Sequence, residues 1–306
     1  MAKIEVEHFT KDYGHGRGVF DISFKINEGE VYGFLGPNGA GKSTTIRHLM
    51  GFSKPDSGKT KILGMDSFDN YYKFMDKVGY LPGEIALPDG LNGYEFLDMM
   101  EKLKKVKDDK WVKYLLDLFE LDPSGDTKRM SLGIKRKLAV VTAFMNDPDI
   151  LILDEPTSGL DLAMQQTFIE FIKKEKERGK TILLSSHIFS EVDATCDRIA
   201  IIKDGKIVNE FIANDLKHNK NKNYLVEFES SQIADKFSKD NMSSDSFKIV
   251  EVHDKNILVN IDDKNINKLI KVLANYDIKG FSHIKETLED YFMKYYKEDK
   301  DFGGAL

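Results

Sequence analysis

The chain has 306 residues, of which 41% are hydrophobic and 31% charged, with 7 Pro and 23 Gly. This composition is typical of a globular protein with room for about two domains, and it excludes a wholly disordered or collagen-like chain. The 45 Lys+Arg and 51 Asp+Glu give a net charge of -6, so no overall positive field attracts nucleic acid or anionic lipid.

Apolar runs are all much shorter than the roughly 20 residues needed to cross a bilayer. Residues 1–7 alternate polar and apolar types and include acids, unlike a signal or transit peptide. The single cysteine, Cys196, cannot form an internal disulfide, which fits a reducing compartment. We therefore expect a soluble, cytoplasmic protein that needs a partner for any work at a membrane.

Up to about residue 210, short β-rich runs alternate with longer helical runs, the pattern of a sheet covered by helices. Several predicted strands are almost entirely apolar, which suits strands that are buried on both faces. The predicted strands are Ile4–Phe9, Phe20–Ile26, Val31–Leu35, Val78–Leu81, Ile150–Leu153, Thr181–Ser185 and Arg198–Ile202. The predicted helices are Lys42–Met50, Tyr94–Val106, Lys110–Phe119, Ser131–Met145, Asp161–Arg178 and Ile188–Cys196. After the last strand, Asp204-Gly205 predicts a hairpin turn.

A second region begins near His218, where a Lys/Asn run at residues 217–223 predicts a polar linker. The elements expected after it follow the order β-α-β-β-α-β, which is that of the ferredoxin-like fold. They are Tyr224–Glu229, Gln232–Lys239, Phe247–His253, Asn256–Ile261, Lys264–Asn275 and Ile278–His283, followed by a last helix, Lys285–Tyr296. We predict an α/β domain at residues 1–216, with a helical subdomain at about 84–147, and a small α+β domain at 217–306.

The strongest motif lies between the apolar strand Val31–Leu35 and a predicted helix. It fits G-x-x-x-x-G-K-[ST] in the context of a P-loop, whose glycines let main-chain N–H groups face phosphate oxygens at a helix N-terminus. A chance glycine turn is the alternative, and the correct flanks argue against it. We expect Lys42 to pair with the β- and γ-phosphates and Ser43 to ligate Mg²⁺. The motif comprises Gly36, Pro37, Asn38, Gly39, Ala40, Gly41, Lys42, Ser43 and Thr44.

Two acids, Asp154 and Glu155, follow the apolar strand Ile150–Leu153. This places carboxylates at the carboxyl edge of a parallel sheet, where α/β folds bind their ligands. We expect Asp154 to hold Mg²⁺ through water and Glu155 to act as the general base that accepts the proton of an attacking water. Alone, the two acids would be read as the end of a strand; the P-loop upstream favours the catalytic interpretation.

Three further segments narrow the prediction. Met130–Arg136 opens a predicted helix, Ser158–Asp161 follows the two acids, and Ser185–His187 ends the next strand. With the P-loop and the acids, and in this order and spacing, they make residues 1 to about 215 resemble the nucleotide-binding subunit of ATP-binding cassette (ABC) transporters. The resemblance implies the P-loop NTPase cassette fold, ATPase activity, and ATP and Mg²⁺ as ligands.

The resemblance also assigns roles to single residues. It implies that Tyr13 stacks on adenine, that Ser131 and Gly133 belong to the family signature, that Asp161 lies in the D-loop, and that His187 is the switch histidine at the γ-phosphate. In the family, the signature of one subunit binds the ATP held by the other, so two subunits pair head to tail. Taken singly, Ser131 would also be read as a plain N-cap, Tyr13 as a loop aromatic and His187 as a strand-end histidine.

The sequence departs from the family pattern in two places. The signature helix usually opens Leu-Ser-Gly-Gly-Gln, whereas here Leu132 replaces the first glycine and Ile134 the glutamine. After Val78–Pro82, Gly83 stands where the family has a glutamine that ligates Mg²⁺ and senses the membrane partner, and Glu84 is a candidate replacement at the metal. Both departures bear on the rate of hydrolysis and on coupling more than on nucleotide binding.

We therefore expect an ATPase subunit that forms a homodimer or heterodimer around two ATP and powers an exporter with separately encoded permease subunits. It would lie at the inner face of the cell membrane, and its cargo would be a peptide, antimicrobial or drug-like compound. The small domain would brace the dimer, contact the permease, sense a signal, or only pack. The alternatives are a weakly hydrolysing regulatory module and a soluble cassette ATPase acting on ribosomes or nucleic acid; a single P-loop and the lack of a long heptad insertion argue against the latter, so no nucleic-acid partner is expected.

Overall fold

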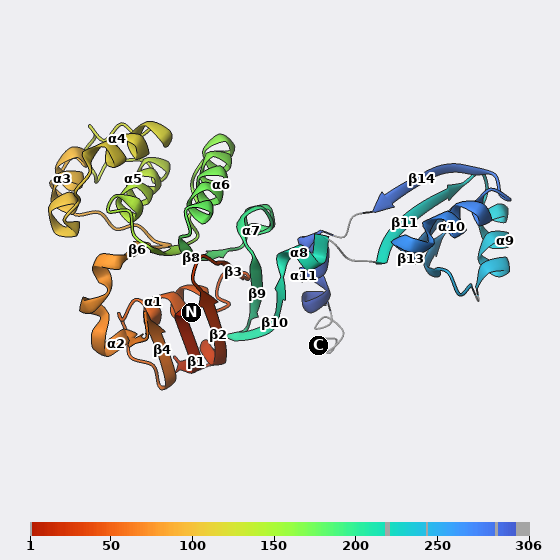
Figure 1. Ribbon diagram of the computed structural model, residues 1–306, viewed down its shortest axis with the longest axis horizontal. Coiled ribbons are helices and arrows are strands. Elements are labelled where there is room, and N and C mark those ends of the chain that lie inside the picture. The colour runs from red at the N-terminus through yellow and green to blue at the C-terminus, as the bar shows by residue number, and fades with distance from the viewer. Residues whose placement is uncertain (1, 218–220, 243, 285–286, 298–306) are drawn as a thin grey trace. The chain divides into compact units, whose positions relative to one another are not determined.

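Two units divide the chain in the computed structural model, Met1–Ala213 and Asn214–Leu306 (Figure 1). The structure describes residues 2–217, 221–242, 244–284 and 287–297. Within these residues, no helix is both long and apolar enough to cross a membrane.

A six-stranded sheet forms the centre of the first unit, in the order β10-β9-β3-β8-β7-β6. Five of its strands are parallel and β10 runs antiparallel to β9 at one edge. The predicted hairpin turn joins these two, with positive φ at both Asp204 and Gly205, as a two-residue turn requires. The strands β3, β7 and β8 are buried along their whole length, as their apolar sequences predict. The bounds are β3 Val31–Leu35, β6 Val78–Leu81, β7 Ile150–Asp154, β8 Thr181–Ser186, β9 Arg198–Lys203 and β10 Lys206–Ile212.

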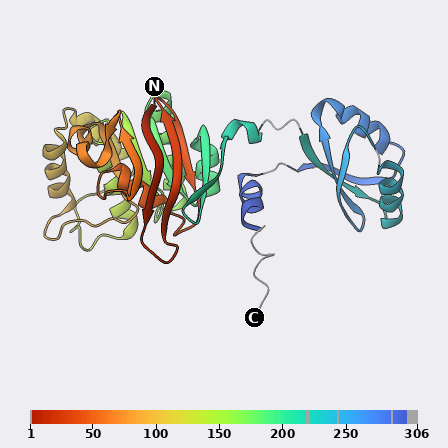
Figure 2. The ribbon, with the colours of Figure 1, turned by 90° about the horizontal axis from the view of Figure 1, so that it is seen from below.

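A second, antiparallel sheet in the same unit has the order β2-β1-β4-β5 (red and orange, Figure 2). Its inward side chains, among them Ile4, Phe9 and Phe24, share one hydrophobic core with Phe34 and Ile152 of the central sheet. Neither β4 nor β5 was predicted, because in β4 only Thr60 and Ile62 face inward and the segment reads as polar. The bounds are β1 Ala2–Asp12, β2 Gly18–Asn27, β4 Ser57–Ile62 and β5 Met65–Asp66.

Helices α3, α4 and α5 lie together beside α6 in the first unit (Figure 1). The rings of Phe119 and Phe144 both contact Phe171 of α6, and the Trp111 indole N–H donates to the Phe144 carbonyl at 2.9 Å. Aromatic contacts therefore join the helical part to the rest of the unit. The helices of the unit are α1 Lys42–Leu49, α2 Ser67–Asn70, η1 Tyr71–Lys73, η2 Met75–Lys77, α3 Gly93–Lys104, α4 Asp109–Leu118, α5 Leu132–Phe144, α6 Leu162–Glu177 and α7 Phe189–Thr195. Each predicted element of this unit is present, with bounds that differ by a few residues.

The second unit follows the predicted β-α-β-β-α-β order, and its antiparallel sheet has the order β12-β13-β11-β14. Its core contains Val226, Phe228, Phe237, Ile257 and Leu269. The elements are α8 Ala213–Lys217, β11 Asn221–Phe228, α9 Ser231–Asn241, β12 Lys248–His253, β13 Asn256–Asp262, η3 Asp263–Asn265, α10 Ile266–Leu273, β14 Ile278–Ile284 and α11 Leu288–Lys297.

Two predictions fall partly outside the described residues. Of the predicted linker, residues 218–220 are not described, and residues 221–223 belong to β11, so that part of the prediction is wrong. Pairing with β13 on one side and β14 on the other overrides the low strand preference of Lys and Asn, and the Asn260 side chain donates to Asn223 Oδ1 at 2.7 Å. Of the predicted last helix, residues 285–286 lie outside the described residues, and α11 begins at Leu288.

Candidate functional site

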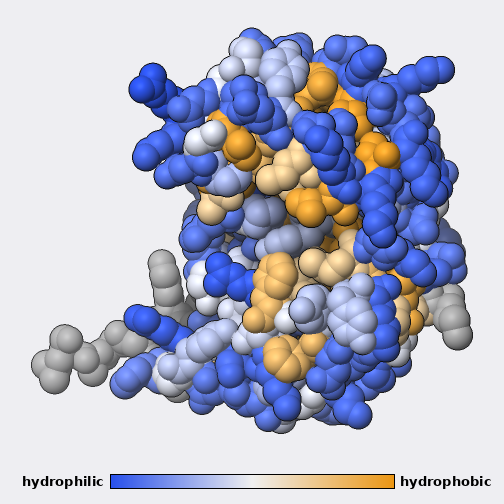
Figure 3. Space-filling view, turned by 90° about the vertical axis from the view of Figure 1, so that its left-hand side faces the viewer, coloured by the Kyte–Doolittle hydropathy of each residue, from blue (hydrophilic) through white to orange (hydrophobic). Residues whose placement is uncertain are grey.

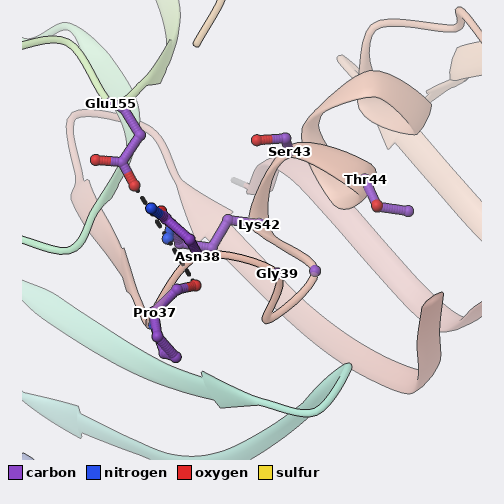
Figure 4. A pocket seen from close by; sticks show the side chains of 8 residues that line it. Pro37, Asn38, Gly39, Lys42, Ser43, Thr44 and Glu155 are labelled. Atoms are coloured by element: carbon purple, nitrogen blue, oxygen red, sulfur yellow. Dashed lines mark hydrogen bonds and ion pairs between the residues drawn. The ribbon is translucent and has the colours of Figure 1, made fainter. Parts of the chain in front are cut away.

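The P-loop joins β3 to α1 through a turn that needs glycine. Gly39 and Gly41 have φ of 84° and 109°, in the left-handed region where other residues are strained. At Gly36 a Cβ atom would lie 2.4 Å from the Ile202 carbonyl oxygen. The loop thereby closes around a small pocket at the beginning of α1 (Figure 4), lined by Pro37, Asn38, Gly39, Gly41, Lys42, Ser43, Thr44 and Glu155.

Lys42 is the cation of this pocket, and only 4% of it is exposed. Its Nζ donates to the carbonyl oxygens of Gly36 at 2.6 Å and Pro37 at 3.1 Å, and it lies 3.0 Å from Glu155 Oε1 (Figure 4). A buried ammonium is stable only with such partners. The loop therefore holds the positive charge at the place where the sequence predicts phosphate.

The two acids stand at the end of β7, where Asp154 is its last residue and Glu155 begins a sharp turn of the backbone. Asp154 is buried and accepts a hydrogen bond from Ser185 Oγ at 2.5 Å. Glu155 adopts a left-handed φ of 48°, and its N–H donates to the Ser185 carbonyl at 3.0 Å. This turn directs the Glu155 side chain toward Lys42, while the His187 Nδ1 donates to Glu155 Oε2 at 2.6 Å. The Glu155 carboxylate therefore contacts both Lys42 and His187, and the three residues come from three separate segments.

A wider cleft adjoins the pocket. It is lined by Asn38, Ser43, Thr44, Arg47, Tyr80, Pro82, Gly83, Glu84, Asp154, Glu155, Ser158 and His187. Among the described residues, no group of three or more His, Cys, Asp or Glu could hold a metal ion by itself. The oxygen donors of Ser43 and Asp154 nevertheless fit Mg²⁺, which needs only one or two carboxylates when phosphates and water complete its shell.

Gly83 leaves room for Asp154 in this cleft. A Cβ atom at residue 83 would lie 2.9 Å from Asp154 Oδ2, so the missing side chain leaves that oxygen unobstructed on this side. Burial, and to a smaller extent the charge of Asp154, raises the pKa of Tyr80 to about 12. The Tyr80 hydroxyl therefore keeps its proton at neutral pH.

The segment that carries His187 is held by a carboxyl group that the sequence analysis missed. Ser186 Oγ donates to Glu191 Oε2 at 2.6 Å and accepts from the Ile188 N–H at 2.9 Å. Glu191 is 1% exposed, and burial raises its pKa to about 7, with the Ser186 hydrogen bond acting in the opposite direction and the nearby Glu155 charge adding to the rise. The signal in the sequence was weak, because Glu191 is one of two acids in the short helix that follows His187.

The other predicted site residues lie elsewhere. Ser131 and Asp161 are N-caps of α5 and α6, and their side chains accept from Ile134 N at 3.3 Å and Met164 N at 2.9 Å. Tyr13 is 56% exposed, with Lys11 Nζ 5.7 Å from its ring centre. Among the described residues, Tyr13, Ser131, Gly133 and Asp161 line neither the pocket nor the cleft.

Comparison with known proteins places this geometry in a family. The sequence model of the ABC transporter family matches residues 19–158. The ABC transporter ATP-binding protein YhcH of Bacillus subtilis is 32% identical over 304 residues, covering 97% of both chains. The bacitracin transport ATP-binding protein BcrA of Bacillus licheniformis is 33% identical over 302 residues, covering 95% of this chain and 96% of the relative. A solved structure of the ATP-binding subunit of an ABC transporter shares 29% identity and a TM-score of 0.63, covering 70% of this chain and 91% of that one.

These similarities confirm the resemblance seen in the motifs, together with the cassette fold and ATP and Mg²⁺ as the ligands of the family. The chain belongs to the ABC transporter family, as an ATP-binding cassette subunit and an ATPase.

Proposed function

We propose that two copies of this cassette close around two ATP, that Glu155 activates the hydrolytic water, and that the resulting motion drives an exporter. The observation that carries the proposal is the meeting of Lys42, Glu155 and His187 at the P-loop pocket. A cation for the phosphates, a carboxylate for the water and an imidazole beside it are the groups that this hydrolysis needs.

Nucleotide binding is assigned to the P-loop. Main-chain N–H groups of the loop that follows Pro37, residues 38–44, surround the phosphates, Lys42 pairs with the β- and γ-phosphates, and Tyr13 stacks on the adenine. Ser43 and Asp154 would hold Mg²⁺, and Glu84, which lines the same cleft, is a further candidate. Bound there, Mg²⁺ would neutralise negative charge on the phosphate oxygens.

Glu155 acts as the general base. It takes a proton from water, the water oxygen bonds to the γ-phosphorus, and the bond from phosphorus to the bridging β–γ oxygen breaks, which releases ADP and phosphate. His187 holds the Glu155 carboxylate through Oε2. We assign to it the contact with the γ-phosphate as well. Phosphate oxygens compete with Glu155 Oε1 for the Lys42 ammonium. Nucleotide binding therefore releases the Glu155 carboxylate from Lys42, which frees it to act as the base.

A second copy would supply the residues that do not line the pocket. Ser131, Gly133 and Asp161 lie at the beginnings of α5 and α6, which also carry exposed apolar side chains: Leu132 is 57% exposed, Ile134 38% and Leu162 83%. Apolar side chains beside helix N-termini suit a surface that closes on another protein and on phosphate. We assign this surface to the nucleotide face of a partner cassette, in a homodimer or a heterodimer.

The membrane partner would bind where the face shown in Figure 3 is hollowed, between the helical part and the rest of the first unit. Large apolar side chains are exposed on neighbouring elements, Tyr72 at 65%, Tyr94 at 57% and Phe52 at 55%. BcrA is a bacitracin transport protein by name, and a 34% identical relative from Burkholderia lata is a Nod factor export ATP-binding protein. We propose separately encoded permease subunits, export of a peptide, antimicrobial or drug-like compound, and a location at the inner face of the cell membrane. The unit after residue 216 serves as an accessory domain.

The Glu155→Gln variant tests this proposal. Glutamine preserves the shape of the side chain but cannot take a proton, so ATP should bind and not turn over. We expect light scattering to show a dimer with Mg·ATP and a monomer without it, and steady-state hydrolysis to fall by about a thousandfold or more. Lys42→Ala should stay monomeric, and the exposed Glu177→Gln should behave as the wild type.

Wild-type hydrolysis by Glu155→Gln would refute the general base, and an ATP-bound monomer would refute the homodimer. The exporter is tested separately, by measuring whether vesicles that contain the membrane protein encoded beside this chain stimulate the ATPase. A wild type with slow hydrolysis that no such membrane protein stimulates would favour the regulatory module.

A further inference from the structure

Arg136 of α5 is among the largest side chains that the first unit buries completely. Only 2% of it is exposed, although a charged side chain is almost never buried without partners. In the sequence, Arg136 is the last residue of the signature segment Met130–Arg136. The structure gives it contacts that a plain helix position does not need.

Its partners are three main-chain carbonyl groups from two other segments. Nε donates to the Ser158 oxygen at 2.9 Å, Nη1 to Pro82 at 2.9 Å, and Nη2 to Gly83 at 2.7 Å. A planar guanidinium can satisfy three acceptors at once, which a lysine ammonium on one flexible stem cannot do with the same geometry. Burial lowers the pKa of Arg136, and the charges of Asp154, Glu155 and Glu191 oppose that change.

Both of the bound segments border the cleft that holds Asp154 and Glu155. Gly83 lies against the Asp154 carboxylate, since its Cβ would be 2.9 Å from Oδ2. Because Gly83 has no side chain, residue 83 itself meets Asp154 only through its main chain, and Arg136 is bonded to that main chain. The Ser158 carbonyl belongs to the turn after the two acids.

The third connection runs along α5 itself. Arg136 lies about one turn after Ser131, which is the N-cap of α5. From Arg136 onward, most residues of this helix are buried. Next to the cap, Leu132 packs on the same turn that Arg136 bonds: a Cβ at Gly159 would lie 2.9 Å from Leu132 Cγ, and one at Gly133 would lie 3.0 Å from the Gly159 oxygen. The helix start and the cleft edge are therefore fixed to each other at two points.

We propose that Arg136 is a positioning residue for ATP hydrolysis, which fixes the Pro82–Gly83 segment and the Ser158 turn to the helix that begins at Ser131. Residue 83 has no side chain of its own, so the Arg136 guanidinium connects the Pro82–Gly83 segment to the turn after the two acids and to the signature helix. The proposal rests on the proposed function of the site. We expect the loss of Arg136 to displace the Pro82–Gly83 segment and the Ser158 turn, which border the two acids, and to leave the P-loop intact.

The test compares Arg136→Gln and Arg136→Lys in the full chain, with Lys137→Gln on the same helix as the matched control. We expect Arg136→Gln to lower kcat for ATP by about 10- to 100-fold, as misplacement near a reacting group does, with KM changed less than about threefold. Arg136→Lys should recover part of kcat, and Lys137→Gln should match the wild type. Added ethylguanidinium, well below denaturing concentrations, should raise kcat of Arg136→Ala, because it replaces the side chain beyond Cβ.

The fluorescence of Trp111, the single tryptophan, reports whether each variant is folded. If folded Arg136→Gln retains wild-type kcat, or if KM rises while kcat is unchanged, the positioning role is refuted. If Arg136→Gln does not fold, the kcat and KM of Arg136→Lys provide the same test of the positioning role. An inactive wild type would instead refute the proposed function, so the two failures are distinguishable.

Discussion

Replacing Glu191 by glutamine tests whether the fold holds this buried carboxyl in its neutral form. Burial raises its pKa from an ordinary value of 4.5 to about 7. A difference of one in pKa corresponds to about 1.4 kcal/mol, so this rise corresponds to about 3 kcal/mol of stability. Because the folded pKa is the higher one, that stability is complete below pH 4.5 and is lost as the pH rises through 7.

The assay is urea unfolding at pH values from 4.5 to 8.5, followed through Trp111. This tryptophan lies in the first unit, as Glu191 does, so its fluorescence reports the unfolding of the relevant unit. Glutamine cannot ionise and can still accept the Ser186 hydrogen bond. We expect Glu191→Gln to gain up to about 3 kcal/mol relative to the wild type between the lowest and the highest pH.

The exposed Glu177→Gln serves as the control and should follow the wild type at every pH. If the stability difference between the wild type and Glu191→Gln does not change with pH, Glu191 ionises as an exposed glutamate does. That result would contradict the raised pKa of Glu191, and with it the role of this buried carboxyl as a neutral group that stabilises the His187 segment below pH 7.

Gly36→Ala should destabilise the first unit by about 1–3 kcal/mol and weaken ATP binding in calorimetry, because its Cβ would lie 2.4 Å from the main-chain oxygen of Ile202; wild-type affinity would contradict this. Phe237→Ala should lower the free energy of unfolding of the second unit by about 3–5 kcal/mol, measured by hydrogen exchange of β11 and β13. The Trp111 melting curve should not change; a shifted curve would show that this core does not unfold separately from the first unit. His48 is buried and its pKa is lowered mainly by burial, so the wild type should lose stability as the pH falls below 6.5, whereas His48→Gln should lose less; equal acid sensitivity of the two would refute this.

The shared location of the P-loop and the two acids could be predicted because it follows from sheet topology. The P-loop follows β3 and the two acids stand at the end of β7, and parallel strands of one sheet bring such ends to the same edge. The burial of β3, β7 and β8 could likewise be read from their apolar sequences. By contrast, β4 was missed because only two of its side chains face inward, and β11 begins within a Lys/Asn run whose strand pairing comes from distant segments.

The side-chain contacts of the site could not be predicted from the order of motifs. The approach of Glu155 to Lys42 and His187 depends on a left-handed backbone turn at a residue that is not glycine. Arg136 and Glu191 are charged residues in helices that carry other charged residues as well, and solvent exposure is the ordinary expectation for them. Arg136 finds its partners in segments far apart in sequence, and Glu191 pairs with nearby Ser186; the burial of both comes from tertiary packing that the sequence pattern does not reveal.

The central claim is that Lys42, within the P-loop, holds the phosphates of ATP next to Asp154 and Glu155. Titration calorimetry with a slowly hydrolysed ATP analogue, with and without Mg²⁺, tests it directly on the wild type and on Lys42→Ala. We expect one analogue per chain, with affinity that rises when Mg²⁺ is present, and a loss of about a hundredfold or more in Lys42→Ala. Equal binding by the two folded proteins, or binding that ignores Mg²⁺, would contradict the account.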